Sequence, residues 1–437
     1  MLDIKKIREN KEAIESALLK RMDSVSLDQI INLDNKRIEL RTKLNVLQEK
    51  RNKVSKSIPL LKKQGVDVSE YISEMRLVGD EISLLNYKAT EIEELLKDVL
   101  SALPNIPDED VLAGGKENNK VIKTFKEQPK FDFEPKDHTT LANELGLIDF
   151  ERGVKLGGQG CWIYTGLGAQ LEWALLNYFV NSHLADGWNF QLVPHMLNYE
   201  CGYTAGQFPK FQEEVYWLDG GYSKDGKFML PTAETALVNL HRNEILNEED
   251  LPKKYFGYTP CYRREAGSSR VEERGTVRGH QFNKVELIQY TAENDSERAF
   301  DEMLEKAERL VQGLGLHYQV SKLAAGDCSA SMCRTYDIEI WIPSMGIYKE
   351  VSSVSNSRDY QARRGNMKYR DAESNKIKFM HTLNASGLAT SRLLPAILEQ
   401  NQLADGSVLI PEVLRPYMGD IDRIYPIEKS FVKKLTK

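Results

Sequence analysis

Two stretches within the first hundred residues repeat their apolar positions every seven residues. In the first stretch, one seam runs through positions 33, 40, 47 and 54, and a companion seam holds Ile30, Leu44 and Ile58. In the second stretch, nearly all of the residues at alternating steps of four and three are apolar, at positions 71, 75, 78, 82, 85, 89, 92, 96 and 99. Such spacing is typical of the a and d positions of coiled-coil helices. It predicts two helices of about 30 residues, each roughly 45 Å long.

A short break, IPLLKKQGVDVS at 58–69, separates the two stretches. We expect Pro59 and Gly65 to end the first helix, because proline lacks the backbone donor and glycine accepts the left-handed conformation of a helix end. Ser69 is the expected cap of the returning helix. The sequence therefore predicts an antiparallel helical hairpin, which is a long arm and not a compact core.

The two predicted helices differ in charge. Residues 34–63 contain ten Lys and Arg residues but only Asp34, Glu39 and Glu49 as acids, whereas the returning helix is mostly acidic. One interpretation is that the helices pair their charges across the coiled coil, and the other is that the excess cations bind RNA phosphates. Both interpretations stay open. The candidates for RNA contact are Lys43, Lys50, Arg51 and Lys53.

The chain of 437 residues is longer than one core usually allows, so two or three domains are expected. A segment rich in proline, glycine and polar residues follows the heptads, and beyond it strand-like runs such as FNKVELIQYT alternate with longer helical patterns. We expect an N-terminal domain at 1–102, a linker at 103–125 and an α+β catalytic domain at 126–437 around a largely antiparallel sheet.

Composition points to a folded protein of the cytoplasm. Apolar residues make up 41% of the chain and charged residues 28%, and the net charge of −6 gives no global attraction for nucleic acid. The start, MLDIKKIREN, lacks the apolar core of a signal peptide, and no stretch approaches the roughly 20 apolar residues of a membrane span. The five scattered cysteines are expected to be free thiols in a reducing compartment.

The stretch YRREAGSSRVEERGTVRGHQF at 262–282 concentrates guanidinium groups between two aromatic residues. Interpreted as strand, loop and strand, it brings residues of like parity onto one face, and these are Arg263, Glu265, Arg278, Phe282 and Glu286. A guanidinium suits phosphate oxygens, an aromatic ring stacks on a base, and a carboxylate accepts from an ammonium. Because the P-loop and Rossmann glycine motifs are absent from the sequence, side chains of this kind would have to hold a nucleotide.

The same stretch resembles motif 2 of the class II aminoacyl-tRNA synthetases, and its residue sequence is similar to that of the seryl-tRNA synthetase family in particular. Four further segments agree with that family in order, and the HIGH and KMSKS signatures of class I are absent. The first, GAQLEWALLNYFVNSHLADGWNFQLVP, is similar to the dimer-forming motif 1, and the next two are PTAETALVNLHRNEIL and YDIEIWIPSMGIYKEVSSVSNSRDYQARR. The last, NASGLATSRLLPAILEQNQ, is similar to motif 3.

The resemblance implies an enzyme that joins L-serine to tRNA(Ser) with ATP and Mg²⁺, and that works as a homodimer with a class II antiparallel-sheet domain and a coiled-coil arm. It implies catalytic roles for Arg263, Arg278 and Arg392. It implies ATP contacts from Arg263, Glu265, Arg278, Phe282, Glu350, Ser353 and Arg392, with Glu350 and Ser353 holding the magnesium ion. It implies serine contacts from Thr232, Glu234, Arg263, Glu286, Asn384 and Ser386, and tRNA contacts from Lys43, Lys50, Arg51 and Lys53.

Some positions depart from the family's pattern. The loop from Ser269 to Gly275 reads SRVEERG where GRDTRG is usual, Ala325 and Val354 replace a common threonine and cysteine, and motif 3 reads GLATSR. The altered loop, Ser269 to Glu273 above all, bears on tRNA recognition more than on adenylation. Two alternatives therefore stay open: a diverged paralogue that supplies seryl-adenylate or seryl-tRNA to a specialised or antibiotic-related pathway, and a non-catalytic RNA-binding relative.

Overall fold

A computed structural model describes residues 1–218, 221–265 and 275–427. The chain divides into two compact units, one of Leu2–Pro104 and the other of Met1 with Asn105–Lys437. Among the described residues, no helix combines the length and the apolar character that a membrane span requires.

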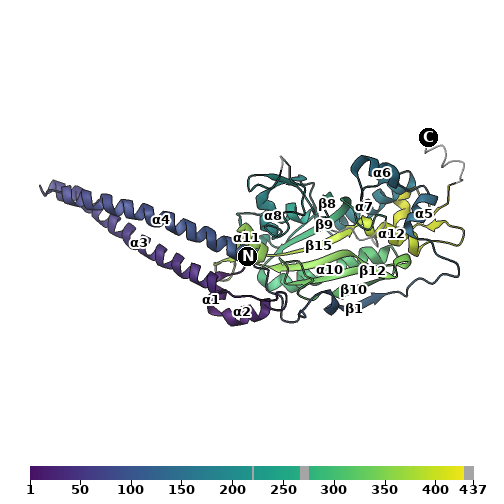
Figure 1. Cartoon of the computed structure of the whole chain (residues 1–437), viewed down its shortest axis with the longest axis horizontal. Coiled ribbons are helices and arrows are strands. Elements are labelled where there is room, and N and C mark those ends of the chain that lie inside the picture. The colour runs from purple at the N-terminus through teal and green to yellow at the C-terminus, as the bar shows by residue number, and fades with distance from the viewer. Residues whose placement is uncertain (219–220, 266–274, 428–437) are drawn as a thin grey trace. The chain divides into compact units, whose positions relative to one another are not determined.

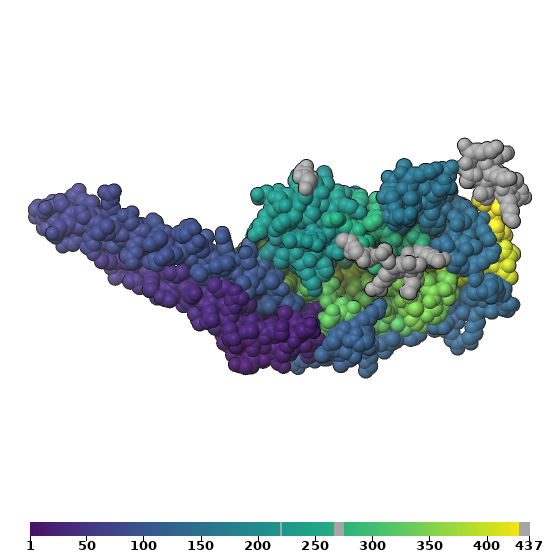
Figure 2. Space-filling model, viewed as in Figure 1, coloured from purple at the N-terminus to yellow at the C-terminus, as the bar shows by residue number. Residues whose placement is uncertain are grey.

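The first unit is helical, with α1 (Ile4–Glu9) and α2 (Lys11–Leu18) followed by the long helices α3 (Asp28–Lys63) and α4 (Ser69–Ala102). Figure 1 shows α3 and α4 running side by side, and in Figure 2 their side chains fill the space between them. The buried seam contains Leu44, Met75, Val78, Ile82 and Ala89. The heptad prediction of a helical hairpin is therefore confirmed, except that the seam does not include Tyr71, which is 41% exposed.

The turn of the hairpin differs from the prediction at both ends. Helix α3 continues through Pro59 to Lys63. Proline has no backbone N–H, so the carbonyl of Ser55, four residues earlier, has no helical donor. The helix tolerates this because Ser55 is exposed. After the helix ends, Gly65 has a φ of +77°, which lets Val66 N–H donate to Leu61 O at 3.1 Å.

Ser69 does not cap the second helix as predicted. The acceptor comes instead from Asp67, whose Oδ1 receives the Ser69 backbone N–H at 3.0 Å and its hydroxyl at 2.7 Å. A carboxylate two residues before the first helical turn satisfies an amide that the helix itself leaves unpaired.

The second unit is built on an eight-stranded sheet in the order β1-β10-β11-β12-β15-β9-β8-β4. The strands are β1 (Lys120–Phe125), β10 (Tyr318–Lys322), β11 (Arg334–Ile342), β12 (Ile347–Arg358), β15 (His381–Ala389), β9 (Gln281–Thr291), β8 (Lys253–Tyr262) and β4 (Asn189–Phe190). All neighbours are antiparallel except the short pair β4–β8. This sheet confirms the predicted α+β fold around a largely antiparallel sheet (Figure 1).

One face of this sheet is apolar and packs into the main core. Leu287, Val354 and Ala385 point to this face and join a single buried cluster with residues of α7 (Leu167–Ala185), α10 (Ser296–Gly313) and α12 (Thr390–Gln400). Successive strand residues alternate between faces, so the polar neighbours of these residues lie on the opposite face. The helices therefore leave one polar face of the central strands for a site.

Shorter elements surround the sheet. The helices are α5 (His138–Glu144), α6 (Phe150–Gly157), α8 (Tyr199–Ala205), α9 (Glu234–Leu237) and α11 (Tyr360–Gly365). The strands are β2 (Ile148–Asp149), β3 (Ile163–Tyr164), β5 (Met196–Asn198), β6 (Lys227–Met229), β7 (Ile245–Asn247), β13 (Lys368–Arg370), β14 (Ile377–Phe379), β16 (Val408–Leu409) and β17 (Arg423–Ile424).

The segment at 103–125, expected to be a linker, is packed into the second unit from Asn105 onward. The buried amide of Asn105 donates to Ser331 O at 3.0 Å and to Ser357 O at 2.9 Å. Further along, β1 pairs with β10 as the edge strand of the sheet. The linker prediction rested on proline and glycine content, and these long-range hydrogen bonds have no signature in the local sequence.

Candidate active site

The register of β8 and β9 places the residues of the opening stretch. Cys261 lies opposite Phe282, and Gly257 opposite Glu286. Beyond the paired strands, Arg263 N–H donates to His280 O at 2.9 Å, so the pairing continues. Opposed residues share a face, and the Arg263 guanidinium lies over the Phe282 ring, 5.1 Å from its centroid. The cation and the ring thus form one surface, as the parity of the sequence predicts.

A second guanidinium lies on the same hairpin. Arg278 Nε donates to Glu265 Oε2 at 2.6 Å, which joins the two ends of the segment between the strands. Glu265 has a φ of +49°, in the left-handed region that is uncommon for a residue with a side chain. Of the residues between them, 266–274 lie outside the described residues, and these include the altered loop from Ser269 to Glu273.

Arg392, at the start of α12, joins this hairpin to β12. Its Nη1 donates to the backbone carbonyl of Glu350 at 2.8 Å and lies 3.6 Å from the Glu350 carboxylate. Its Nε donates to Val277 O at 3.3 Å. Arg392, predicted to contact ATP, and Glu350, predicted to hold the magnesium ion, are therefore direct neighbours.

Glu350 and Ser353 lie beside two further carboxylates of β11. Ser353 Oγ donates to Asp337 Oδ1 at 2.6 Å, and Glu350 is opposite Glu339 in the strand register. Burial, together with the charge of Glu350, raises the pKa of Asp337 well above its usual range. Among the described residues, no group of three His, Cys, Asp or Glu side chains has metal-binding geometry. Glu350, Ser353 and Asp337 nevertheless supply hard oxygen donors, which suit Mg²⁺.

The predicted serine contacts gather further along β9. Ser386 lies directly opposite Glu286 in the β15–β9 pair, and Asn384 is two residues away on the same face. Thr232, from the loop before α9, donates from Oγ1 to Glu286 Oε2 at 3.5 Å. All four side chains are buried. Together they make a small buried polar cluster.

Glu234 lies beside this polar cluster. Its Oε1 accepts from Gln361 Nε2 at 2.9 Å. Burial, and the nearby charge of Glu286, raise the pKa of Glu234 to about 7. A carboxyl with such a pKa is close to its midpoint at neutral pH, so the polar cluster carries less negative charge than its composition suggests.

Lys284 is a residue of this site that the sequence prediction omitted. It lies on β9 between Phe282 and Glu286, and its Nζ forms an ion pair with Glu286 Oε2. The side chain of Lys284 is 8% exposed. Lys284 is an alternate residue of the strand with Phe282 and Glu286, so strand alternation alone could have placed it on the site face.

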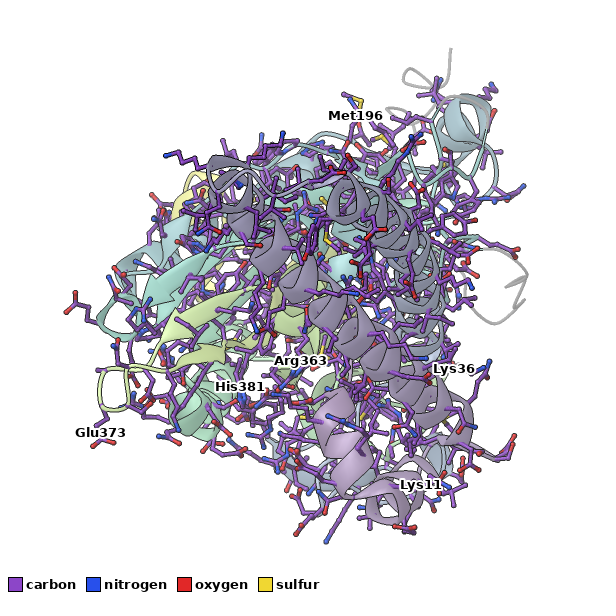
Figure 3. The ribbon with its side chains drawn as sticks, turned by 90° about the vertical axis from the view of Figure 1, so that its left-hand side faces the viewer. Lys11, Lys36, Met196, Arg363, Glu373 and His381 are labelled. Atoms are coloured by element: carbon purple, nitrogen blue, oxygen red, sulfur yellow. The ribbon has the colours of Figure 1, made fainter. Side chains whose placement is uncertain are left out.

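The predicted RNA contacts of the helical unit lie on exposed parts of α3. Lys50 pairs with Glu74 of α4 at 2.5 Å, while Lys43 and Lys53 pair along α3 with glutamates four residues before them. Within the described part of the chain, no ion pair of Arg51 is found. Figure 3 shows Lys36 projecting from the same helix. Charge pairing within the hairpin thus accounts for part of the basic pattern, and some cations are left over.

The antiparallel sheet and the two arginine-bearing segments define a class II aminoacyl-tRNA synthetase core. The family model of the tRNA synthetase class II core domain (G, H, P, S and T) matches residues 216–401, and that of the seryl-tRNA synthetase N-terminal domain matches residues 1–107. The chain belongs to the seryl-tRNA synthetase family.

Individual relatives agree with this assignment. The chain is 58% identical to serine--tRNA ligase 2 of Clostridium acetobutylicum over 96% of this chain and 99% of the relative. It is 44% identical to serine--tRNA ligase of Fervidobacterium nodosum over 98% and 100%. Among solved structures, seryl-tRNA synthetase of Pyrococcus horikoshii complexed with ATP is 32% identical, with a TM-score of 0.89 over 98% of this chain and 100% of that one.

Proposed function

We propose that the chain activates L-serine with ATP as seryl-adenylate and transfers the seryl group to tRNA(Ser) in the cytoplasm. The observation that carries the proposal is the alignment of two subsites on one sheet face. Arg263 and Phe282 lie at one end of this face, and the small polar cluster around Glu286 lies at the other. A nucleotide and an amino acid bound there would meet between them.

The residues suit adenylate formation without a general acid or base. The serine carboxylate attacks the α-phosphorus, a P–O bond forms, and pyrophosphate leaves with the electrons of the broken bond. Arg263 and Arg278 would stabilise the α-phosphoryl oxygens and Arg392 the γ-phosphate, while Phe282 stacks on adenine and Glu265 accepts from its amine. Catalysis then consists of positioning and charge stabilisation.

Glu350 and Ser353 would hold the magnesium ion, with Asp337 hydrogen-bonded beside them. The bound ion would neutralise negative charge on the phosphates. Magnesium prefers a few protein oxygens and otherwise keeps water and phosphate ligands, which agrees with a site of so few protein donors.

The polar cluster favours serine over alanine. Thr232 and Glu286 would bind the substrate ammonium together with Glu234, and Ser386 and Asn384 would lie near the hydroxyl. An alanine side chain would leave buried polar groups without a partner, and sites built to bind a hydroxyl reject such analogues strongly.

We also propose a homodimer. Large apolar side chains are exposed on α7 and just after it, with Trp173 56%, Leu184 46%, Leu192 78% and Met196 59% exposed. Trp173 and Leu184 are eleven residues apart and so lie on one side of the helix, and Figure 3 shows Met196 at the margin of the molecule. A second copy of the chain would bury these residues.

The test is charging of total tRNA with labelled serine by the purified chain. Serine incorporation that depends on ATP and intact tRNA is the expected result. Formation of seryl-adenylate without charging would favour the paralogue that serves a specialised acceptor. RNA binding without activation of any amino acid would favour the non-catalytic relative.

A further inference from the structure

Lys284 is a buried cation in the middle of the candidate site, and the reaction proposed above does not yet use it. Phe282, Lys284 and Glu286 are alternate residues of β9 and share one face. A buried ammonium is costly unless it is paired. The partner of Lys284 is the Glu286 carboxylate.

Glu286 is also the group that would receive the ammonium of serine. Its Oε2 already contacts both Lys284 Nζ and the Thr232 hydroxyl. Two ammonium groups on one buried oxygen repel each other. The nearby Glu234 compensates only in part, because its pKa of about 7 leaves it partly protonated at neutral pH. Serine therefore competes with Lys284 for Glu286.

Once displaced from Glu286, the Lys284 ammonium can reach the space between Phe282 and Glu286. Alternate residues of a strand are roughly 7 Å apart, so the backbone of Lys284 lies midway between the ring of Phe282 and the carboxylate of Glu286. If adenine stacks on the Phe282 ring and the serine ammonium binds the Glu286 carboxylate, the α-phosphate and the serine carboxylate lie between these two groups. The flexible four-carbon stem of lysine can turn its ammonium to either side.

We propose that Lys284 is a catalytic residue, whose ammonium leaves Glu286 when serine binds and then contacts the serine carboxylate and the α-phosphate. This inference rests on the proposed function. In the step, the carboxylate oxygen bonds to the α-phosphorus as the bond to pyrophosphate breaks, and Lys284 keeps its proton. Its charge stabilises the phosphoryl oxygens only after serine has arrived.

The kinetic test is Lys284→Met, which keeps the length of the side chain and removes its charge. We expect kcat for serine-dependent ATP–pyrophosphate exchange to fall about 100-fold, the usual effect of removing a preorganised charge. The KM for serine should stay level or fall, because Glu286 is left to the substrate alone. Lys284→Arg should recover part of kcat.

Lys254→Met is the matched control, because Lys254 also pairs with a glutamate, at 2.6 Å, but on the other face of the sheet. It should leave kcat unchanged. Wild-type kcat in Lys284→Met, or a raised KM with kcat retained, would overturn the inference, since either result would show that Lys284 only orients Glu286.

A second measurement uses the wild-type protein and so does not depend on the folding of a variant. It is the crystal structure with the seryl sulfamate of adenosine, a stable mimic of seryl-adenylate. Lys284 Nζ should lie within hydrogen-bond distance of the sulfamate or the seryl carbonyl, with the ligand ammonium on Glu286. Lys284 still paired with Glu286 in this complex would refute the proposed movement of its ammonium. A wild-type protein that neither binds this compound nor catalyses serine-dependent ATP–pyrophosphate exchange would instead count against the proposed function.

Discussion

At the residue scale, Arg392 links the segment at 262–282 to β12, since it donates to Val277 O and to Glu350 O. Arg392→Ala should reduce kcat/KM for adenylate formation about 100- to 1,000-fold, because the phosphates no longer meet a fixed positive charge there. Arg263→Ala should reduce it by the same order. Arg370→Ala is the control, because this exposed arginine bonds only to Asn375 among the partners found. Near-wild-type ATP–pyrophosphate exchange in both Arg392→Ala and Arg263→Ala would contradict the assignment of these arginines to phosphate binding.

Glu172 of α7 connects the core to the site strands and should make stability depend on pH. Its Oε1 accepts from Asn283 Nδ2 at 2.8 Å and from Thr390 Oγ1 at 2.6 Å. Burial raises the pKa of Glu172 from 4.5 to about 7. The folded state therefore holds this proton more tightly than the unfolded state, so stability is lost as the pH rises from about 4.5 to 7.

Glu172→Gln should remove this dependence, because it keeps the Oε1 acceptor and cannot ionise. Between pH 5.5 and 8, the free energy of unfolding of the wild type should fall by about 2 kcal/mol more than that of the variant. The measurement is denaturant unfolding of both proteins at the two pH values. Parallel pH profiles would contradict a raised pKa in the folded protein.

At the element scale, the periodic spacing of apolar and polar residues predicted the elements better than it predicted contacts between distant residues. The alternation of β9 was enough to place Phe282 and Glu286 on one face, and the heptads were enough to pair α3 with α4. The ion pair of Lys284 was not predicted, since a local sequence pattern does not reveal that this side chain is buried beside Glu286. The continuation of α3 through Pro59 was missed because an exposed carbonyl tolerates the absence of a backbone donor.

The basic helix α3 gives a prediction about tRNA. Changing Lys50, Arg51 and Lys53 together to Gln should weaken tRNA binding and lower the slope of log K against log salt by about one for each phosphate that is no longer neutralised. Adenylate formation should be unaffected. Filter binding at several salt concentrations measures the slope. The control changes Lys116, Lys120 and Lys376, exposed lysines of the other unit, and an equal effect there would attribute the weaker binding to net charge alone.

At the scale of the whole molecule, the exposed apolar side of α7 predicts the oligomeric state. The wild type should sediment at twice the mass of one chain, and Trp173→Asp should shift it toward the monomer, because a buried charge without a partner is costly at an interface. Trp173→Phe should remain dimeric. A wild-type monomer at micromolar concentration would contradict the proposed homodimer.

In the proposed reaction, ATP and serine bind on the polar face of this sheet and react there. The most direct measurement is amino-acid-dependent ATP–pyrophosphate exchange with serine, threonine, alanine and glycine under identical conditions. We expect exchange with serine at a kcat/KM far above that with alanine, because alanine leaves the buried hydroxyl-binding groups unpaired. Exchange with another amino acid in preference to serine, or with none of the four, would contradict it.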